Sequence, residues 1–145
     1  MDESKLQKLI DRNEIIDTLN RYATSVDTRD WDLLLTAYTD EIEVDMISVG
    51  RPEVLTMSAK DFGELIERAV LPFDSTQHLL SNYVVEINGD SATCVAYLHV
   101  QHFRMEGDEA KAVTRGGYYS NNLVRTSEGW RINKYKVVIT WTLTV

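Results

Sequence analysis

Hydrophobic and polar positions follow helical spacing through much of the first half of the chain. Three helices are predicted there, over Glu3–Val26, Trp31–Tyr38 and Ala59–Val70, because their apolar residues recur three or four positions apart. Asp30 precedes the second helix and Ser58 the third, and both residue types are favoured N-caps. In the first helix the apolar stripe, which we expect to face the core, consists of Leu6, Leu9, Ile10, Ile16, Leu19, Tyr22, Ala23 and Val26.

A second pattern, the alternation of apolar and polar residues, is typical of half-buried strands. It predicts a short strand around Ile42, Val44 and Met46, and four long strands at residues 77–88, 91–104, 111–126 and 130–143. Turn signals between the long strands are Asn88-Gly89, Gly107 and Ser127-Glu128-Gly129. We therefore predict an antiparallel meander covered by the helices. Residues 1–145 would then form a single α+β domain whose curved sheet encloses a small-molecule pocket.

The composition excludes several classes of partner. The chain has 145 residues, of which 43% are hydrophobic, and a formal net charge of −8. Nucleic acid and anionic membranes both need a cationic surface, so an acidic protein matches neither. No apolar run approaches the length of a membrane span, the N-terminal residues are charged, and Cys94 is the only cysteine. We therefore expect a cytoplasmic protein that binds neither nucleic acid nor membranes.

Three histidines are the first candidates for chemistry: His78, His99 and His102. His99 and His102 are three residues apart on one predicted strand, so their side chains should leave it on opposite faces. They cannot bind one metal ion together unless the strand is bulged, and we predict no metal site. Acid–base chemistry remains, in which a histidine carries a proton and a carboxylate fixes its orientation.

Asp27 is a candidate for that carboxylate. It lies four residues after Ala23, at the end of the first predicted helix, and so continues the apolar stripe. A purely structural role, as a cap of the turn into the second helix, fits the pattern equally well. His78 begins a predicted strand, where the pattern slightly favours a hydrogen-bonded residue without a catalytic role. The pattern alone leaves both interpretations open for both residues.

Six short segments spread over nearly the whole chain add to this picture. They are Tyr22–Trp31, with its Tyr, Asp and Asp-Trp, then Thr76–Asn82, Asn88–Ala92, Gly117–Tyr119, Val124–Thr126 and Gly129–Ile132. In order and spacing they resemble the SnoaL-like, scytalone-dehydratase-like branch of the nuclear-transport-factor-2-like superfamily. The resemblance implies a cone-shaped α+β barrel, in which a curved antiparallel sheet and N-terminal helices enclose a pocket.

The resemblance also implies roles for individual residues. In the dehydratases of this family an Asp on the first helix orients a His on the sheet, and neither metal nor cofactor is needed. Asp27 and His78 match this catalytic pair. The expected binding residues of the pocket are Tyr22, His102, Tyr119 and Asn121; the last two lie on the same face of one strand.

Two positions depart from scytalone dehydratase, because Val26 and Met46 stand where that enzyme has tyrosines. Scytalone itself is therefore not the expected substrate. We predict a lyase that removes water or another leaving group from a small apolar, cyclic or polyketide-like substrate. An isomerase or cyclase with the same base, or a non-catalytic ligand-binding or subunit domain, are the alternatives. The last strand is apolar on both faces over Val137–Leu143, so we expect a homodimer or homotrimer.

Overall fold

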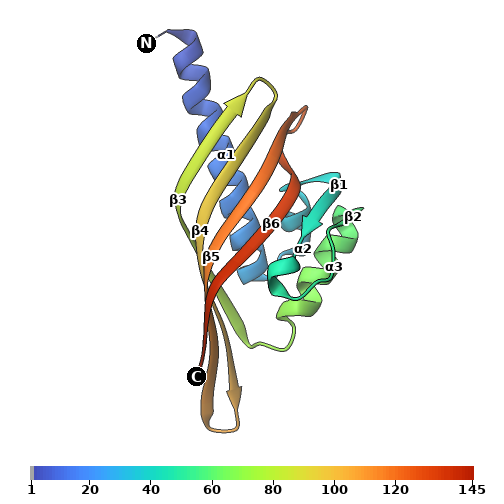
Figure 1. The fold of residues 1–145 in the computed structure, drawn as a ribbon, viewed down its shortest axis with the longest axis vertical. Helices are drawn as coiled ribbons and strands as arrows, with labels where there is room; N and C mark the ends of the chain where they lie inside the picture. Colours follow the sequence, from blue (N-terminus) through green and yellow to red (C-terminus); the bar gives the residue numbers. More distant parts are fainter. Residues whose placement is uncertain (1) are drawn as a thin grey trace.

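A computed structural model describes residues 2–145 and contains three α-helices, a short 3₁₀ helix and six strands (Figure 1). The helices are α1 (Glu3–Thr28), α2 (Trp31–Leu35), η1 (Ile47–Val49) and α3 (Ala59–Val70). The strands are β1 (Tyr38–Asp45), β2 (Leu55–Ser58), β3 (Ser75–Asn88), β4 (Ser91–Glu106), β5 (Glu109–Thr126) and β6 (Gly129–Thr144). The predicted α+β class is confirmed. The three helices and the four long strands lie within a few residues of the positions that the periodicity predicted.

All six strands form one sheet in the order β2-β1-β6-β5-β4-β3. The last four strands make the predicted antiparallel meander. The prediction of a wholly antiparallel sheet is wrong, because β1 pairs with β6 in parallel and β2 then pairs with β1. Alternation along the chain identifies a strand but not its neighbour, and β2 is too short to give a clear alternation.

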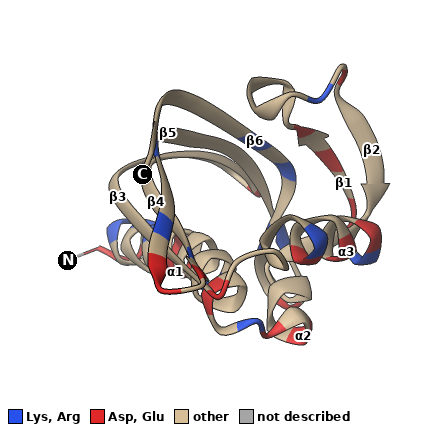
Figure 2. Ribbon diagram, turned by 90° about the horizontal axis from the view of Figure 1, so that it is seen from below, with Lys and Arg blue, Asp and Glu red and all other residues tan. Residues whose placement is uncertain are grey.

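The sheet is strongly curved, and the helices lie on its concave side (Figure 2). Register shifts interrupt the pairing at four places: between Tyr38 and Glu43, between Ser81 and Val84, between Gly116 and Gly117, and between Asn122 and Leu123. An extra residue in one strand bends it and increases its twist, so these irregularities contribute to the curvature. The resulting cone is open, with β2 and β3 as its edge strands.

The end of α2 differs from the sequence-based expectation. The helix stops at Leu35, and Tyr38 is a buried residue of β1 rather than the last residue of the helix. The Ile132 amide donates a hydrogen bond to the Ala37 carbonyl (2.8 Å), so pairing with β6 begins immediately after the helix. Tertiary pairing therefore overrides the helical spacing of these residues.

The core fills the space between the concave face of the sheet and the helices. Leu19 and Val26 of α1 and Phe62 of α3 are almost fully buried, and they pack in one cluster with inward-facing strand residues such as Leu98 and Ile132. The N-terminal turns of α1 differ from this pattern, because the end of the helix extends past the sheet (Figure 1).

The predicted inward stripe of α1 is consequently wrong at its beginning. Leu6, Leu9 and Ile10 are exposed, and Ile15 rather than Ile16 is fully buried. A gap separates these turns from β3, lined by Leu9 on the helix and by Val85 and Ile87 on the strand, so the apolar stripe is not packed there. Within residues 2–145, no helix combines the length and hydrophobicity that crossing a membrane requires.

Candidate active site

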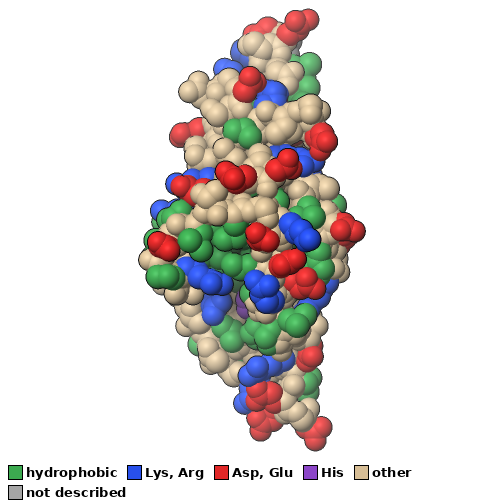
Figure 3. Space-filling model, turned by 90° about the vertical axis from the view of Figure 1, so that its right-hand side faces the viewer, with side chains coloured by type: hydrophobic (Ala, Val, Ile, Leu, Met, Phe, Trp, Pro, Cys, Tyr) green, Lys and Arg blue, Asp and Glu red, His purple; other side chains and the backbone are tan. Residues whose placement is uncertain are grey.

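A cavity of about 260 Å³ opens between the concave face of the sheet, the end of α1, α3 and the segment around η1. Its walls are mostly apolar, with a few tyrosine, histidine and arginine side chains among them. Figure 3 shows a hollow on this side of the molecule, with histidine atoms inside it and hydrophobic and basic side chains around it. The lining residues are Tyr22, Val26, Met46, Val49, Arg51, Leu65, Ile66, Ala69, Val70, His78, Leu98, Val100, His102, Arg115, Tyr119, Tyr135, Val137 and Ile139.

Asp27 and His78 meet at the wall of this cavity. Asp27 lies in the last turn of α1 and His78 near the start of β3, and their side chains are joined by a 2.6 Å contact between Asp27 Oδ1 and His78 Nδ1. The His78 side chain is 7% exposed and that of Asp27 is 21% exposed. The proximity that we predicted for the two groups is therefore present, and Nε2 is the ring nitrogen left for a ligand.

Asp27 has further partners that fix its position. The Thr76 hydroxyl donates a hydrogen bond to Asp27 Oδ1 (2.9 Å), and the backbone amide of His78 donates one to Oδ2 (2.7 Å). Both carboxylate oxygens are thus engaged by the first residues of β3. A carboxylate that accepts several hydrogen bonds is stabilised in its charged form, which suits it to a histidine partner.

The chain direction at this point is set by Arg29. This residue ends α1 in the left-handed conformation, with φ 56°. Its guanidinium donates hydrogen bonds to the carbonyls of Val70 (3.3 Å) and Phe73 (2.7 Å). The end of α1 is thereby tied to the segment that leads from α3 into β3, and Asp27 faces His78 as a result.

A cluster of tyrosines forms the floor beside this pair. The ring of Tyr22 on α1 packs edge to face with Tyr119 of β5 (5.7 Å between centroids) and Tyr135 of β6 (5.6 Å), and the last two rings are tilted on each other at 5.6 Å. The Tyr22 and Tyr135 hydroxyls are 3.2 Å from each other. Burial raises the pKa of all three phenols well above the usual value. They stay protonated at neutral pH, so each can donate a hydrogen bond.

His102 lies next to His78, with ring centroids 6.1 Å apart, and stacks on Phe73 at 4.8 Å. Burial lowers the pKa of His102 to about 4, and the nearby charges of His78 and Arg115 add to this effect. His102 is therefore neutral at physiological pH. His99 is on the opposite face of β4, where its ring packs against Trp141, as the strand alternation predicted.

The structure does not bring Asn121 to the cavity. Asn121 is buried, and its side-chain oxygen accepts a hydrogen bond from the backbone amide of Lys136 (3.2 Å), beside the irregularity in the pairing of β5 with β6. It shares a strand face with Tyr119, as expected, but lies farther along the strand. Its position is explained by this backbone contact.

Two cavity residues, Tyr135 and Arg115, were not among the candidates from the sequence. Arg115 is an even number of residues from Tyr119 on β5, and this parity could have indicated that both face the cavity. Tyr135 has the same relation to Val137 on β6. Among residues 2–145, no group of three or more His, Cys, Asp or Glu side chains is arranged to hold a metal ion.

Comparison with known proteins is consistent with this architecture. The sequence matches the SnoaL-like domain over residues 7–136. An uncharacterised protein of Mycobacterium tuberculosis, Rv2910c, is 27% identical over 134 residues, which cover 91% of this chain and 88% of that protein.

Among solved structures, the Kfla4162 protein from Kribbella flavida shares 30% identity with a TM-score of 0.89, covering 94% of this chain and 95% of that one. The LinA-type3 hexachlorocyclohexane dehydrochlorinase from Novosphingobium barchaimii has a TM-score of 0.81 at 18% identity, covering 97% and 94%. The second likeness concerns the fold alone.

Proposed function

The chain belongs to the SnoaL-like family, and from this premise we propose that it is a cofactor-independent lyase whose acid–base pair is Asp27 and His78. Its substrate would be a small, largely apolar cyclic or polyketide-like molecule that loses water. The observation that carries the proposal is the 2.6 Å contact between Asp27 Oδ1 and His78 Nδ1 at the wall of an apolar cavity.

His78 acts as the base in this proposal. Its Nδ1–H is donated to the Asp27 carboxylate, so Nε2 carries the lone pair and abstracts a proton from a carbon next to a substrate carbonyl. The electron pair of that C–H bond moves into the carbonyl to form an enolate. The Asp27 charge stabilises the imidazolium that results.

The tyrosines and His102 complete the reaction. A protonated Tyr22 or Tyr119 hydrogen-bonds the enolate oxygen, where negative charge develops in an apolar cavity and such a bond has a large effect. When the enolate collapses, the C–O bond to the leaving hydroxyl breaks, and that group takes a proton from the imidazolium and leaves as water. Neutral His102, beside His78, is placed to hydrogen-bond the leaving oxygen.

Two further points support an elimination. The cavity is slightly smaller than the usual range for ligand sites and is mostly apolar, which suits a compact ring system. In addition, a dehydrochlorinase has the same fold, so this scaffold is compatible with base-initiated elimination in at least one protein. That likeness extends only to the fold.

The test is a screen of hydroxylated cyclic ketones and polyketide-like compounds, followed by mass spectrometry of the products. Loss of one water, absent with His78→Ala, is the expected result. A product of unchanged mass that still depends on His78 would assign the isomerase or cyclase alternative. Turnover that persists in both His78→Ala and Asp27→Asn would contradict the acid–base proposal.

A further inference from the structure

Arg115 is an unusual basic residue in this sheet. The other Lys and Arg side chains of β4, β5 and β6 each lie within an ion pair with an acidic side chain: Arg104, Lys111, Arg125, Arg131, Lys134 and Lys136. In the described part of the chain, Arg115 has no such partner and no side-chain hydrogen bond. It is half-buried and lines the apolar cavity instead.

The strand register places Arg115 opposite the proposed base. His78 of β3 pairs with Val100 of β4, and Val100 pairs with Arg115 of β5. The three residues form one row across the sheet and project from the same face into the cavity. Because neighbouring strands are about 4.8 Å apart, the backbones of His78 and Arg115 are roughly 10 Å apart.

A second cation borders the same cavity. Arg51 follows η1 in the exposed loop between β1 and β2, and also lacks an acidic partner within residues 2–145. The whole chain has a net charge of −8, so two arginines without acidic partners at one cavity are a local exception to an acidic protein. Figure 3 shows basic side chains beside the hollow.

We propose that the substrate carries a carboxylate, which Arg115 binds inside the cavity and Arg51 helps to attract at its opening. This inference rests on the proposed function only in taking the cavity as the substrate site. A guanidinium binds a carboxylate through two parallel hydrogen bonds. A bound anion would also compensate the positive charge of Arg115, which the apolar walls of the cavity cannot do.

The spacing also restricts the substrate's shape. A separation of roughly 10 Å between the two backbones suits a carboxylate on one side of a small ring system and the carbon that loses its proton on the other. The substrate class is therefore a hydroxylated cyclic keto acid with one or two rings, since the proposed proton abstraction needs a carbonyl beside the reacting carbon. This size agrees with the cavity of about 260 Å³.

The experiment compares acids with their uncharged amides. Binding of benzoate, cyclohexanecarboxylate and 2-naphthoate, each beside the corresponding amide, is measured by calorimetry on the full chain. Wild-type protein should bind at least one acid about tenfold or more tightly than its amide. Arg115→Met should abolish that preference without changing amide binding, and Arg115→Lys should retain part of it.

Lys134→Met is the matched control. It removes one positive charge from the neighbouring strand β6, outside the cavity, and should leave the preference unchanged. Thermal melting of each variant identifies loss of folding. Arg51→Met, at an exposed loop position, should weaken acid binding by a few-fold.

Several outcomes would overturn the proposal: no acid bound at millimolar concentration, equal binding of acid and amide, or the same preference in Arg115→Met. A larger Arg115 effect on 2-naphthyl phosphate than on 2-naphthoate would overturn the choice of a carboxylate. These measurements need no turnover. Acid binding through Arg115, together with no loss of water from any hydroxylated compound of the product screen, would contradict the proposed reaction and leave the carboxylate site unaffected.

Discussion

At the scale of single residues, the candidate site depends on the hydrogen bonds that position the Asp27 carboxylate. Three hydrogen bonds reach its carboxylate, and all three come from Thr76 and His78 at the start of β3. The imidazole is consequently fixed by the same carboxylate that stabilises its charged form. A base that is positioned before the substrate arrives needs little reorganisation during the reaction.

Substitution of either member of the pair should therefore stop turnover without unfolding the protein. Once a substrate is found, His78→Ala and Asp27→Asn should each lower the rate by about a hundredfold or more, since general acid–base catalysis contributes at least that much. His99→Ala is the matched control, because His99 packs on Trp141 at the outer face of β4. Loss of folding in the first two variants, seen by circular dichroism, would instead indicate a structural role.

His102 leads to a second prediction, about stability and pH. The folded protein protonates His102 only near pH 4, whereas the unfolded chain does so near the usual pKa of 6.5. The unfolded state thus binds more protons between these values, and the free energy of unfolding should fall as the pH is lowered from 6.5 to 4.

His102→Phe removes this titration and can keep the stacking on Phe73. It should flatten the pH dependence by about 1–2 kcal/mol, less than a fully buried group would give because the ring is only partly buried. Urea unfolding at a series of pH values measures the difference. Equal slopes in the variant and the wild type would show that His102 is not held neutral by the fold.

The sequence predicted some of these residues and missed others for identifiable reasons. Asp27 and His78 lie at a helix end and a strand start, where position along the chain restricts direction, and the family resemblance singled them out. Arg115 and Asn121 lie in the middle of a long strand. Alternation indicates on which face of the sheet such a residue lies, but not how far along the strand the cavity extends. That extent depends on the curvature of the sheet and on its irregular pairing.

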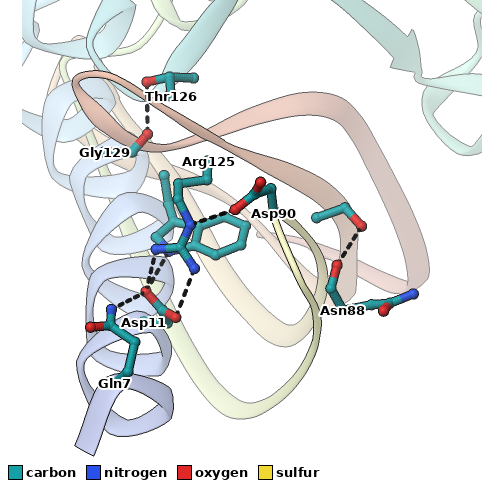
Figure 4. A network of polar contacts seen from close by, with 9 residues as sticks. Gln7, Asp11, Asn88, Asp90, Arg125, Thr126 and Gly129 are labelled. Carbon is teal, nitrogen blue, oxygen red and sulfur yellow. Dashed lines mark hydrogen bonds and ion pairs between the residues drawn. The ribbon is translucent and has the colours of Figure 1, made fainter. Parts of the chain in front are cut away.

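At the scale of elements, α1 is attached to the sheet by polar contacts at two places. Near its C-terminus the attachment is the Asp27 site, and nearer its N-terminus it is the buried residue Asp11 (Figure 4). The Asp11 carboxylate accepts two hydrogen bonds from Arg125 of β5 (2.7 and 2.9 Å) and one from the Trp130 indole (3.1 Å). Arg125 also contacts Asp90 in the β3–β4 turn (2.9 Å).

This second attachment should be important for stability and not for catalysis. Asp11→Asn leaves the Arg125 guanidinium without its main partner and should lower the free energy of unfolding by about 1.5–3 kcal/mol, the usual range for hydrogen bonds to charged groups. Asp17→Asn, at an exposed position of the same helix, should change it little. Chemical denaturation measures both variants, and equal effects would contradict a specific role for Asp11.

The same contact predicts a dependence on pH. The hydrogen bond from Arg125 lowers the pKa of Asp11 from 3.8 to about 2. A carboxyl group whose pKa is lowered by folding stabilises the fold fully at a pH above its pKa in the unfolded chain. It loses that contribution as the pH falls through its pKa in the folded protein. The difference between wild type and Asp11→Asn should therefore persist above pH 3.8 and disappear near pH 2, as acid-denaturation curves of the two proteins would reveal.

Elements were predictable where local signals agree. The third helix has the bounds that its Ser58 cap and apolar stripe predicted, and the Ser58 hydroxyl accepts the Asp61 amide hydrogen bond as an N-cap does (3.0 Å). The turn at Gly107, with φ 62°, also lies where glycine indicated it. The short β2 and the parallel pairing of β1 gave no local signal, because both depend on partners far away in the sequence.

At the scale of the whole molecule, the outer face of the sheet remains to be explained. Leu79, Tyr97 and Trp141 are each about half exposed there and line a shallow groove across β3, β4, β5 and β6. Gly116 permits this arrangement, since a Cβ atom at that position would overlap the Trp141 indole at 2.0 Å. The Trp141 indole thus lies directly against the Gly116 backbone of β5, on the face that the helices do not cover.

An apolar face of this kind is typical of an interface, and the last strand already indicated one from its sequence. We predict that two or three copies of the chain associate through this face, so light scattering at micromolar concentration should give the mass of a dimer or trimer. Tyr97→Asp places a charge in the groove and should yield monomers, whereas Leu71→Asp, at an equally exposed apolar residue after α3, should not. Monomeric wild-type protein, or an unchanged mass in Tyr97→Asp, would refute the interface. The cavity opens on the other side of the sheet, so monomeric Tyr97→Asp should still bind the acids that Arg115 selects.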